Sequence, residues 1–311
     1  MRIVFLGTPD FALQSLKKLA ESKRDIVGVF TQPDKPVGRS KKLAPPPVKV
    51  FAQQNNIPVF QFDKIKSAEG VNALRELKPD LMVTAAFGQL LSQEILDIPK
   101  YGCINVHGSL LPKYRGAAPI QWAIINGEKK TGITTMLTNI GMDTGDMLLK
   151  KEVDILPDET SGELFDRLAD IGAGLLIETL DILDKGKLIS QKQDEKLATT
   201  FPMLKKQDGI IDWNKTNLEL HNFVRGMNPW PIAATHWNGK KISIIKTALT
   251  DISSNGETGS IYEADTKNGL FINCSDKVIQ ILTLQMEGKK AMDAKAFLLG
   301  NKMSVGDKFE G

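Results

Sequence analysis

Short apolar segments alternate with helical patterns through the first half of the chain, and this alternation restricts the possible folds more than any other feature. Residues 2–6 form an apolar run that ends at a glycine, and residues 11–19 then carry apolar side chains at helical spacing. Further apolar runs cover residues 26–31 and 80–86. Such runs are typical of parallel strands covered by helices on both faces. The pattern predicts a Rossmann-like, doubly wound α/β domain at the N-terminus.

The second half of the chain has a different pattern. A helical period covers residues 160–183, and it is lost over residues 185–206. Several short β-rich runs separated by Gly, Asn, Asp and Ser follow, which predicts a small C-terminal β-barrel of the OB-like kind. We therefore expect a catalytic domain at 1–190, a linker at 191–206 and a barrel domain at 207–311.

Composition excludes several classes of protein. Hydrophobic residues make up 41% of the 311 residues and charged residues 25%, as in ordinary soluble proteins. No apolar run reaches the ~18 residues of a membrane span, and the opening lacks a signal-cleavage pattern, so we expect a cytoplasmic protein without a membrane partner. Two distant cysteines and three histidines predict no metal site. Without a heptad or hydrophobic seam, we expect a monomer.

A polar motif follows the apolar pair at residues 103–104. Asn105 and His107 alternate along a predicted strand, so their side chains share a face, and the chain then turns sharply over residues 108–112. Asp143 lies in a polar cluster after another strand-like run at 132–137. An amide, an imidazole and a carboxylate at one strand-end crevice suit acyl transfer. Alternatively, these groups only satisfy backbone atoms and cap a turn.

A basic loop interrupts the first domain. Prolines throughout residues 32–48 prevent a regular helix or a central strand, and four cations surround Gly38, namely Lys35, Arg39, Lys41 and Lys42. A long loop of this kind at a strand end is often functional. A solvated charged loop without a ligand is the alternative interpretation. The formal net charge of +3 is too small to indicate a nucleic-acid partner by itself.

The motif Asn105-x-His107-x-Ser109-Leu110-Leu111-Pro112-x-x-Arg115-Gly116, together with residues 143–146, resembles the folate-dependent formyltransferases. Within that family it is most similar to the members that act on methionyl-tRNA. The opening residues 2–12, the loop at 38–43 and the late segment at 225–231 carry the same resemblance. The similarity therefore covers nearly the whole chain.

The resemblance implies a reaction and its ligands. It implies that 10-formyltetrahydrofolate, as cosubstrate, gives its formyl group to the α-amino nitrogen of methionine on initiator tRNA. It assigns folate contacts to two segments, namely Ser109, Leu110, Leu111 and Pro112 in one and Phe87, Gly88 and Leu91 in the other. It assigns tRNA binding to Lys35, Arg39, Lys41, Lys42 and the C-terminal barrel. The side chains of Phe87 and Leu91 are equally compatible with the protein core.

The implied chemistry gives roles to the polar motif. Asn105 donates to the oxyanion, and His107 is a second donor or the acid. Asp143 either orients His107 and favours its charged form, or accepts the amine's proton through water. Arg115 either acts electrostatically near the substrate or holds its loop by hydrogen bonds. Neither Cys103 nor Ser109 has the partners expected of a nucleophile.

Three other functions remain open from the sequence. The chain could formylate a small amine, such as an amino-sugar nucleotide or glycinamide ribonucleotide. It could hydrolyse the folate with water as acceptor. It could also bind RNA through a degenerate enzyme domain, although the complete polar motif argues against this.

Overall fold

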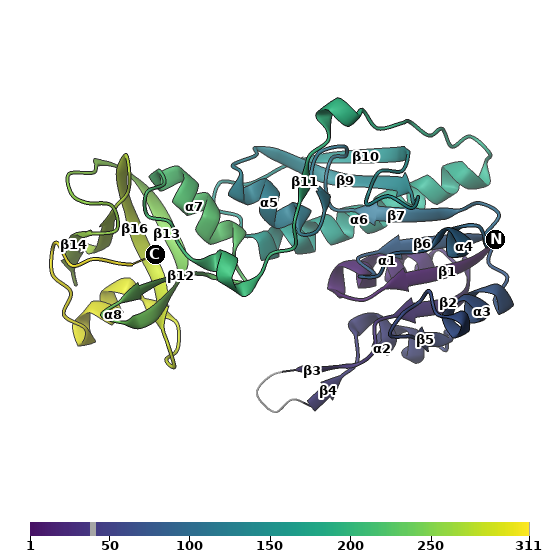
Figure 1. The fold of residues 1–311 in the computed structure, drawn as a ribbon, viewed down its shortest axis with the longest axis horizontal. Helices are drawn as coiled ribbons and strands as arrows, with labels where there is room; N and C mark the ends of the chain where they lie inside the picture. Colours follow the sequence, from purple (N-terminus) through teal and green to yellow (C-terminus); the bar gives the residue numbers. More distant parts are fainter. Residues whose placement is uncertain (38–41, 311) are drawn as a thin grey trace. The chain divides into compact units, whose positions relative to one another are not determined.

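The computed structural model describes residues 1–37 and 42–310, which fall into two compact units (Figure 1). The first unit consists of three stretches of chain: Met1–Pro119, Lys130–Asp154 and Phe165–Phe201. The second also consists of three: Ile120–Lys129, Ile155–Leu164 and Pro202–Gly311. Residues 191–201, expected as part of a linker, belong to the first unit by their contacts. The domain boundaries at 190 and 207 otherwise stay a prediction.

The first unit is built on a seven-stranded sheet with the order β10-β9-β7-β6-β1-β2-β5. Its strands are β1 (Arg2–Gly7), β2 (Asp25–Thr31), β5 (Val59–Gln61), β6 (Leu81–Ala85), β7 (Cys103–His107), β9 (Lys130–Leu137) and β10 (Met147–Asp154). The five strands from β5 to β7 are parallel, whereas β9 and β10 are antiparallel to their neighbours. The predicted doubly wound domain is confirmed.

Helices cover this sheet because each presents an apolar face to it. They are α1 (Asp10–Glu21), α2 (Pro47–Gln54), α3 (Ala68–Glu76), α4 (Gln93–Leu96) and α6 (Ser161–Asp184). Helix α6 packs closely behind β7 and β9, since a Cβ on Gly172 would lie 3.0 Å from a methyl carbon of Val106. The hydroxyls of Thr179 on α6 and Thr135 on β9 are hydrogen-bonded at 2.9 Å. This close packing fixes the strand that carries Asn105 and His107.

Two short pairs of strands lie outside the main sheet. Strands β3 (Lys35–Val37) and β4 (Lys42–Ala44) pair antiparallel as a hairpin in the predicted basic loop. This agrees with the exclusion of a central strand by the prolines, because an isolated hairpin needs fewer ladder hydrogen bonds. Strand β8 (Arg115–Gly116) pairs in parallel with β11 (Thr200–Phe201), so the supposed linker binds the loop after β7.

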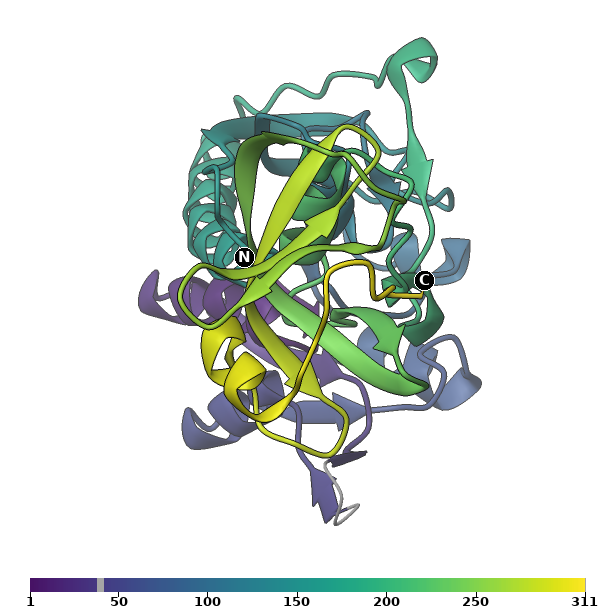
Figure 2. The same cartoon turned by 90° about the vertical axis from the view of Figure 1, so that its left-hand side faces the viewer.

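The second unit is an antiparallel sheet with the order β12-β13-β16-β15-β14, and β17 also pairs with β16 (Figure 2). Its strands are β12 (Ala233–Trp237), β13 (Lys240–Ser253), β14 (Ile261–Asp265), β15 (Gly269–Asn273), β16 (Lys277–Met286) and β17 (Met292–Asp293). Its helices are α5 (Pro119–Ile125), α7 (Asn217–Gly226) and α8 (Ala294–Gly300). The predicted β-rich C-terminal domain is confirmed.

Residues 306–310 join the two edge strands of this sheet. The backbone of Glu310 exchanges both hydrogen bonds with His236 on β12 at 2.9 Å, and Ile261 on β14 bonds Gly306 and Asp307. The tail therefore occupies both sheet edges and gives the unit its barrel character. Among the residues that the structure describes, no helix has the length and apolar character needed to cross a bilayer.

Candidate active site

Asn105 lies on β7, between Thr84 on β6 and Met136 on β9. Its side-chain oxygen accepts a hydrogen bond from the Thr84 hydroxyl at 2.9 Å. Because the oxygen is turned toward Thr84, the NH2 group of the amide is the part that faces away from β6. The arrangement presents a hydrogen-bond donor at the strand end.

His107 is the last residue of β7, and only 5% of its surface is exposed. Its Nε2 lies 3.0 Å from the carbonyl oxygen of Tyr114. A carbonyl can only accept, so Nε2 carries the hydrogen and the neutral ring has its lone pair at Nδ1. That nitrogen lies 3.7 Å from Asp143 Oδ2, which is too long for a hydrogen bond but close enough for attraction between opposite charges.

Asp143 lies in the loop between β9 and β10, in a left-handed conformation with φ of 53°. This conformation is uncommon for residues with a side chain, although Asp and Asn adopt it more readily than others. The backbone N–H of Gly116 donates to Asp143 Oδ2 at 2.8 Å. The carbonyl of Asp143 accepts from the Gln193 amide at 2.7 Å. The structure therefore brings Asp143 to His107, and it fixes the aspartate from two sides.

The turn after β7 contains the first set of predicted folate residues. Ser109 is fully buried, and its hydroxyl donates to the carbonyl of Lys113 at 2.7 Å. The Thr134 hydroxyl donates to the carbonyl of Ser109 and accepts from the N–H of Leu111. Lys150 donates to the carbonyl of Leu111 at 2.6 Å, and partial burial lowers the pKa of this lysine.

The side chains of this turn are used mainly inside the protein. Leu111 packs in a cluster with Met136 and Met147, whereas Leu110 and Pro112 are half-buried. What the turn can offer a ligand is its backbone shape and these two partly exposed side chains.

The second set of predicted folate residues follows β6. Phe87 and Leu91 are buried in the core cluster of the parallel sheet, and the carbonyl of Phe87 accepts from Thr8 and Gln32. Ala86 and Gly88 are exposed and have φ of 43° and 83°. Apart from the two chain neighbours of Gly88, the Gln32 amide nitrogen is the only described atom that would come within 4 Å of a Cβ on Gly88. The accessible surface here is backbone beside open space, which fits a flat ring that needs hydrogen-bonding partners at its edge.

Arg115 is buried, with 5% of its surface exposed, and it holds its loop. Its guanidinium makes two hydrogen bonds to Glu195, at 2.7 and 2.9 Å, and a third to Gln193 at 3.0 Å. The hydrogen bonds that Arg115 donates to Glu195 raise the pKa of Arg115 and lower the pKa of Glu195. Of the two roles considered for Arg115 from the sequence, this geometry fits the one in which the residue holds its loop by hydrogen bonds.

The structure describes two of the four cations that were predicted to bind tRNA. Lys35 and Lys42 are exposed on the β3–β4 hairpin, whereas Arg39 and Lys41 lie outside the described residues. The hairpin's base is anchored by Lys49, whose ammonium donates to both carboxylate oxygens of Asp34 at 2.8 and 2.9 Å. These bonds lower the pKa of Asp34. A basic hairpin is thus attached to the first unit through an ion pair.

The cysteines offer no nucleophile. Burial raises the pKa of both Cys103 and Cys274 to about 12, so neither forms a thiolate at neutral pH. Within residues 1–37 and 42–310, no three His, Cys, Asp or Glu side chains gather as metal ligands.

Sequence reasoning missed the groups that hold the polar motif in place. They are Thr84, the Tyr114 carbonyl, Thr134, Lys150, Gln193 and Glu195. A Thr at the end of the buried run 80–86 was a usable signal for Thr84, because a polar group there needs a partner. The others act through the backbone or over long sequence separations, and no local pattern indicates them.

The family comparison assigns both parts of the chain. Residues 1–180 match the model of the formyl transferase family, and residues 203–302 match the model of the formyl transferase C-terminal domain. The chain belongs to the formyl transferase family. The predicted class of enzyme is thereby confirmed.

Within the formyl transferase family, the chain is similar over nearly its whole length to methionyl-tRNA formyltransferases. The chain is 51% identical to the methionyl-tRNA formyltransferase of Ruminiclostridium cellulolyticum over 99% of both chains. It is 51% identical to that of Acetivibrio thermocellus, again over 99% of each.

Solved structures share the fold. A sugar 3N-formyl transferase, WlaRD, solved in the presence of dTDP and 5-N-formyl-THF, has a TM-score of 0.68 and 21% identity over 93% of this chain and 99% of that one. A methionyl-tRNA formyltransferase from Clostridium thermocellum has a TM-score of 0.57 and 19% identity over 90% of this chain and 99% of that one.

Proposed function

We propose that the chain transfers the formyl group of 10-formyltetrahydrofolate to the α-amino group of methionine on initiator methionyl-tRNA. The product is N-formylmethionyl-tRNA, which serves translation initiation. The observation that carries the proposal is the 51% identity to a methionyl-tRNA formyltransferase over 99% of both chains, which includes both units. A shared catalytic domain alone would leave the acceptor open, because function resides in the site and not in the fold.

The reaction requires stabilisation of one oxygen and movement of one proton. The amine nitrogen attacks the formyl carbon, and the carbonyl oxygen becomes an oxyanion. The amine then loses a proton, and the carbon–nitrogen bond to the folate breaks as the folate nitrogen gains one. No covalent enzyme intermediate is needed, in keeping with the high pKa of Cys103.

Asn105 is the proposed oxyanion donor. Its amide oxygen is held by Thr84 at 2.9 Å, so the NH2 group is available in a fixed direction. A donor fixed in advance stabilises the transition state without reorganisation, and a single one contributes about 3 kcal/mol.

His107 is the proposed proton carrier. The Tyr114 carbonyl holds Nε2–H, so Nδ1 can take the amine's proton and pass it to the folate nitrogen. Asp143 lies 3.7 Å from Nδ1 and stabilises the imidazolium electrostatically. Of the two roles considered for Asp143, this separation supports the one in which the carboxylate acts on the His107 ring. The orienting hydrogen bond to the ring belongs to the Tyr114 carbonyl.

The folate and the tRNA are proposed to bind at different parts of the first unit. The exposed backbone at Ala86 and Gly88 and the turn at 108–113 suit the pterin end of the folate. The basic hairpin around Lys35 and Lys42 suits phosphates, which supply salt-dependent affinity and positioning. We propose the same phosphate-binding role for Arg39 and Lys41 on the basis of the sequence alone. We further propose that the chain works as a monomer in the cytoplasm, where its tRNA substrate is used.

The experiment is formyl transfer from labelled 10-formyltetrahydrofolate, offered in parallel to methionyl-initiator tRNA, an amino-sugar nucleotide, glycinamide ribonucleotide and water. Label on the tRNA that disappears in a His107→Ala variant is the expected result. Label on a small amine, or release of formate, would reject the proposed acceptor and leave the strand-end chemistry standing.

A further inference from the structure

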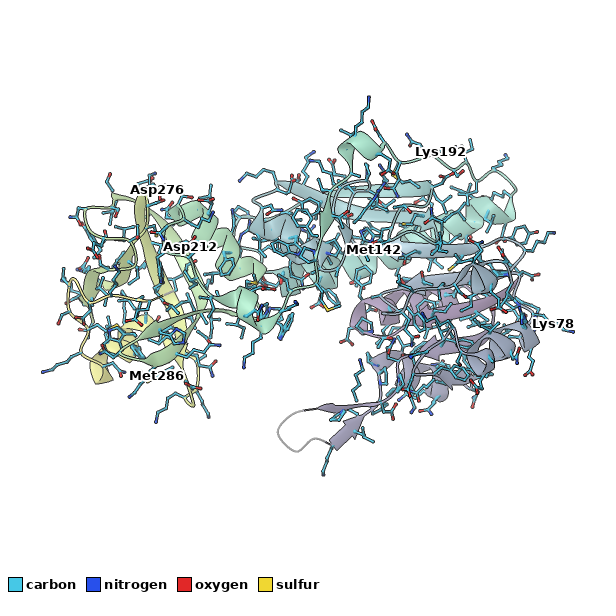
Figure 3. All side chains as sticks on the ribbon, in the orientation of Figure 1. Lys78, Met142, Lys192, Asp212, Asp276 and Met286 are labelled. Carbon is cyan, nitrogen blue, oxygen red and sulfur yellow. The ribbon has the colours of Figure 1, made fainter. Side chains whose placement is uncertain are left out.

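Residues 191–201, here called the strap, cross both loops that carry the site. At one end, the backbone of Gln191 exchanges two hydrogen bonds of 2.8 Å with Met147, at the end of the Asp143 loop. At the other end, β11 pairs with β8, and the rings of Phe201 and Tyr114 stack with centroids 4.9 Å apart. Lys192, labelled in Figure 3, marks the strap, and Met142 marks the Asp143 loop. The strap contains one short 3-10 helix (Glu195–Leu197) and β11, and a segment with this many specific contacts does more than connect two units.

Gln193 is the residue of the strap that reaches the Asp143 loop with its side chain. Its amide nitrogen donates to the carbonyl oxygens of Asp143 and Gly145, at 2.7 and 2.8 Å. Its amide oxygen accepts from Arg115 Nε at 3.0 Å. One side chain thus joins the Asp143 loop to the loop after β7.

The loop after β7 and the strap hold Asp143 from opposite ends. Gly116, the neighbour of Arg115, donates its N–H to the Asp143 carboxylate, and Gln193 binds the carbonyl of the same aspartate. The carbonyl of Tyr114, two residues before Gly116 in the loop after β7, accepts a hydrogen bond from the His107 ring. The distance between the His107 ring and the Asp143 carboxylate therefore depends on how the two loops are joined.

We infer that Gln193 is a positioning residue that sets the separation of Asp143 from His107 for formyl transfer. The inference rests on the proposed function, because that step requires the carboxylate to stabilise the charged ring. Glu195 has a different part in the same network. It neutralises the buried guanidinium of Arg115 and makes no hydrogen bond to the Asp143 loop among those that the described residues record.

Two isosteric variants distinguish the role of Gln193 from that of Glu195. Gln193→Glu keeps an acceptor for Arg115 but replaces the donors to Asp143 and Gly145 with oxygens that repel their carbonyls. Glu195→Gln keeps the size of the side chain and weakens only the pair with Arg115. Lys192→Gln, at an exposed position in the same segment, is the matched control. Gln193→Met serves as a second variant without the donors if Gln193→Glu fails to fold.

The expected result is a loss of kcat of about 10- to 100-fold in Gln193→Glu, because misplacement by an ångström can cost this much. KM for 10-formyltetrahydrofolate and for methionyl-tRNA should stay unchanged, as should kcat in Lys192→Gln. In hydrogen exchange followed by mass spectrometry, residues 138–146 should lose protection in Gln193→Glu and not in Glu195→Gln.

Two results would overturn the inference. One is a wild-type kcat in Gln193→Glu and Gln193→Met. The other is a loss of activity in proportion to the fraction of unfolded protein, with hydrogen exchange raised throughout the first unit. Failure of the proposed function is distinguishable, because the wild-type chain would then not formylate methionyl-tRNA at all, whatever residue 193 is.

Discussion

The strand-end site and the β3–β4 hairpin are held in opposite ways. At the site, His107 and Asp143 are enclosed by hydrogen bonds from several segments, and only 5% of His107 is exposed. On the hairpin, Lys35 and Lys42 are exposed, and the anchoring ion pair lies at the base. Chemistry needs atoms at fixed positions, whereas attraction of a polyanion needs charge within reach. Substitutions at the site should therefore lower kcat, and substitutions on the hairpin should change KM and its salt dependence.

The largest effect is expected from Asn105→Asp. The substitution keeps the size of the side chain but replaces the proposed oxyanion donor with a carboxylate. We expect kcat to fall by about 10²- to 10³-fold, with KM for methionyl-tRNA little changed. Single-turnover formylation at saturating substrates measures this. A kcat within about 3-fold of wild type would remove Asn105 from the proposed mechanism.

A smaller loss of kcat is expected from Thr84→Val. This change is nearly isosteric and removes the hydroxyl that holds the Asn105 amide. We expect kcat to fall by about 10-fold, since the amide loses its fixed direction and a partly buried oxygen loses its partner. Thr84→Ser keeps the hydroxyl and is the matched control. Loss of activity in Thr84→Ser together with wild-type activity in Thr84→Val would show that packing of the methyl group, and not the hydrogen bond, is responsible.

The double variant Lys35→Gln, Lys42→Gln tests the hairpin. We expect kcat and the KM for folate to stay at wild-type values while KM for methionyl-tRNA rises a few-fold. A plot of log affinity against log salt should become shallower by about 1 for each phosphate contact removed. On the basis of the sequence alone, we expect Arg39→Ala to have the same effect. A parallel loss of folate affinity would show that the hairpin belongs to the donor site.

The smallest effect concerns the base of the hairpin. Hydrogen bonds from Lys49 and Gln61 lower the pKa of Asp34, so its stabilising contribution is complete above the ordinary Asp pKa and is lost as the pH falls through the lowered one. Asp34→Asn should melt at a slightly lower temperature than wild type at neutral pH. This difference should close in acid, and thermal unfolding across pH would show it. A constant difference would mean that the ion pair is not its cause.

The sequence was informative where structure follows a local period. The apolar runs at 2–6, 26–31 and 80–86 correspond to β1, β2 and β6, because strands buried on both faces must be apolar throughout. Alternation along β7 correctly indicated that Asn105 and His107 share a face. The strand-like run at 132–137 placed Asp143 at the same strand-end crevice, and the family motif indicated the same residue.

The sequence was uninformative where a segment is held by side-chain bonds to distant backbone. Residues 191–201 have no period and contain several polar residues, so they were predicted as linker. Gln193 nevertheless binds carbonyls 48 and 50 positions away. A carbonyl has the same chemistry at every residue, so such a bond leaves no trace in the sequence. The predicted folate contacts of Phe87 and Leu91 stay untested, although their side chains lie in the core.

The tail at residues 306–310 has a consequence for how the chain is made. It occupies both edges of the antiparallel sheet, at His236 on β12 and at Ile261 on β14. On the ribosome these residues are synthesised after every strand that they bind. The β14 edge and the part of the β12 edge at His236 therefore stay open during translation and resemble the unpaired edges from which strands of different chains associate. Released chains that lack residues 306–310 should depend on a chaperone to stay in solution, whereas released chains that contain these residues should not.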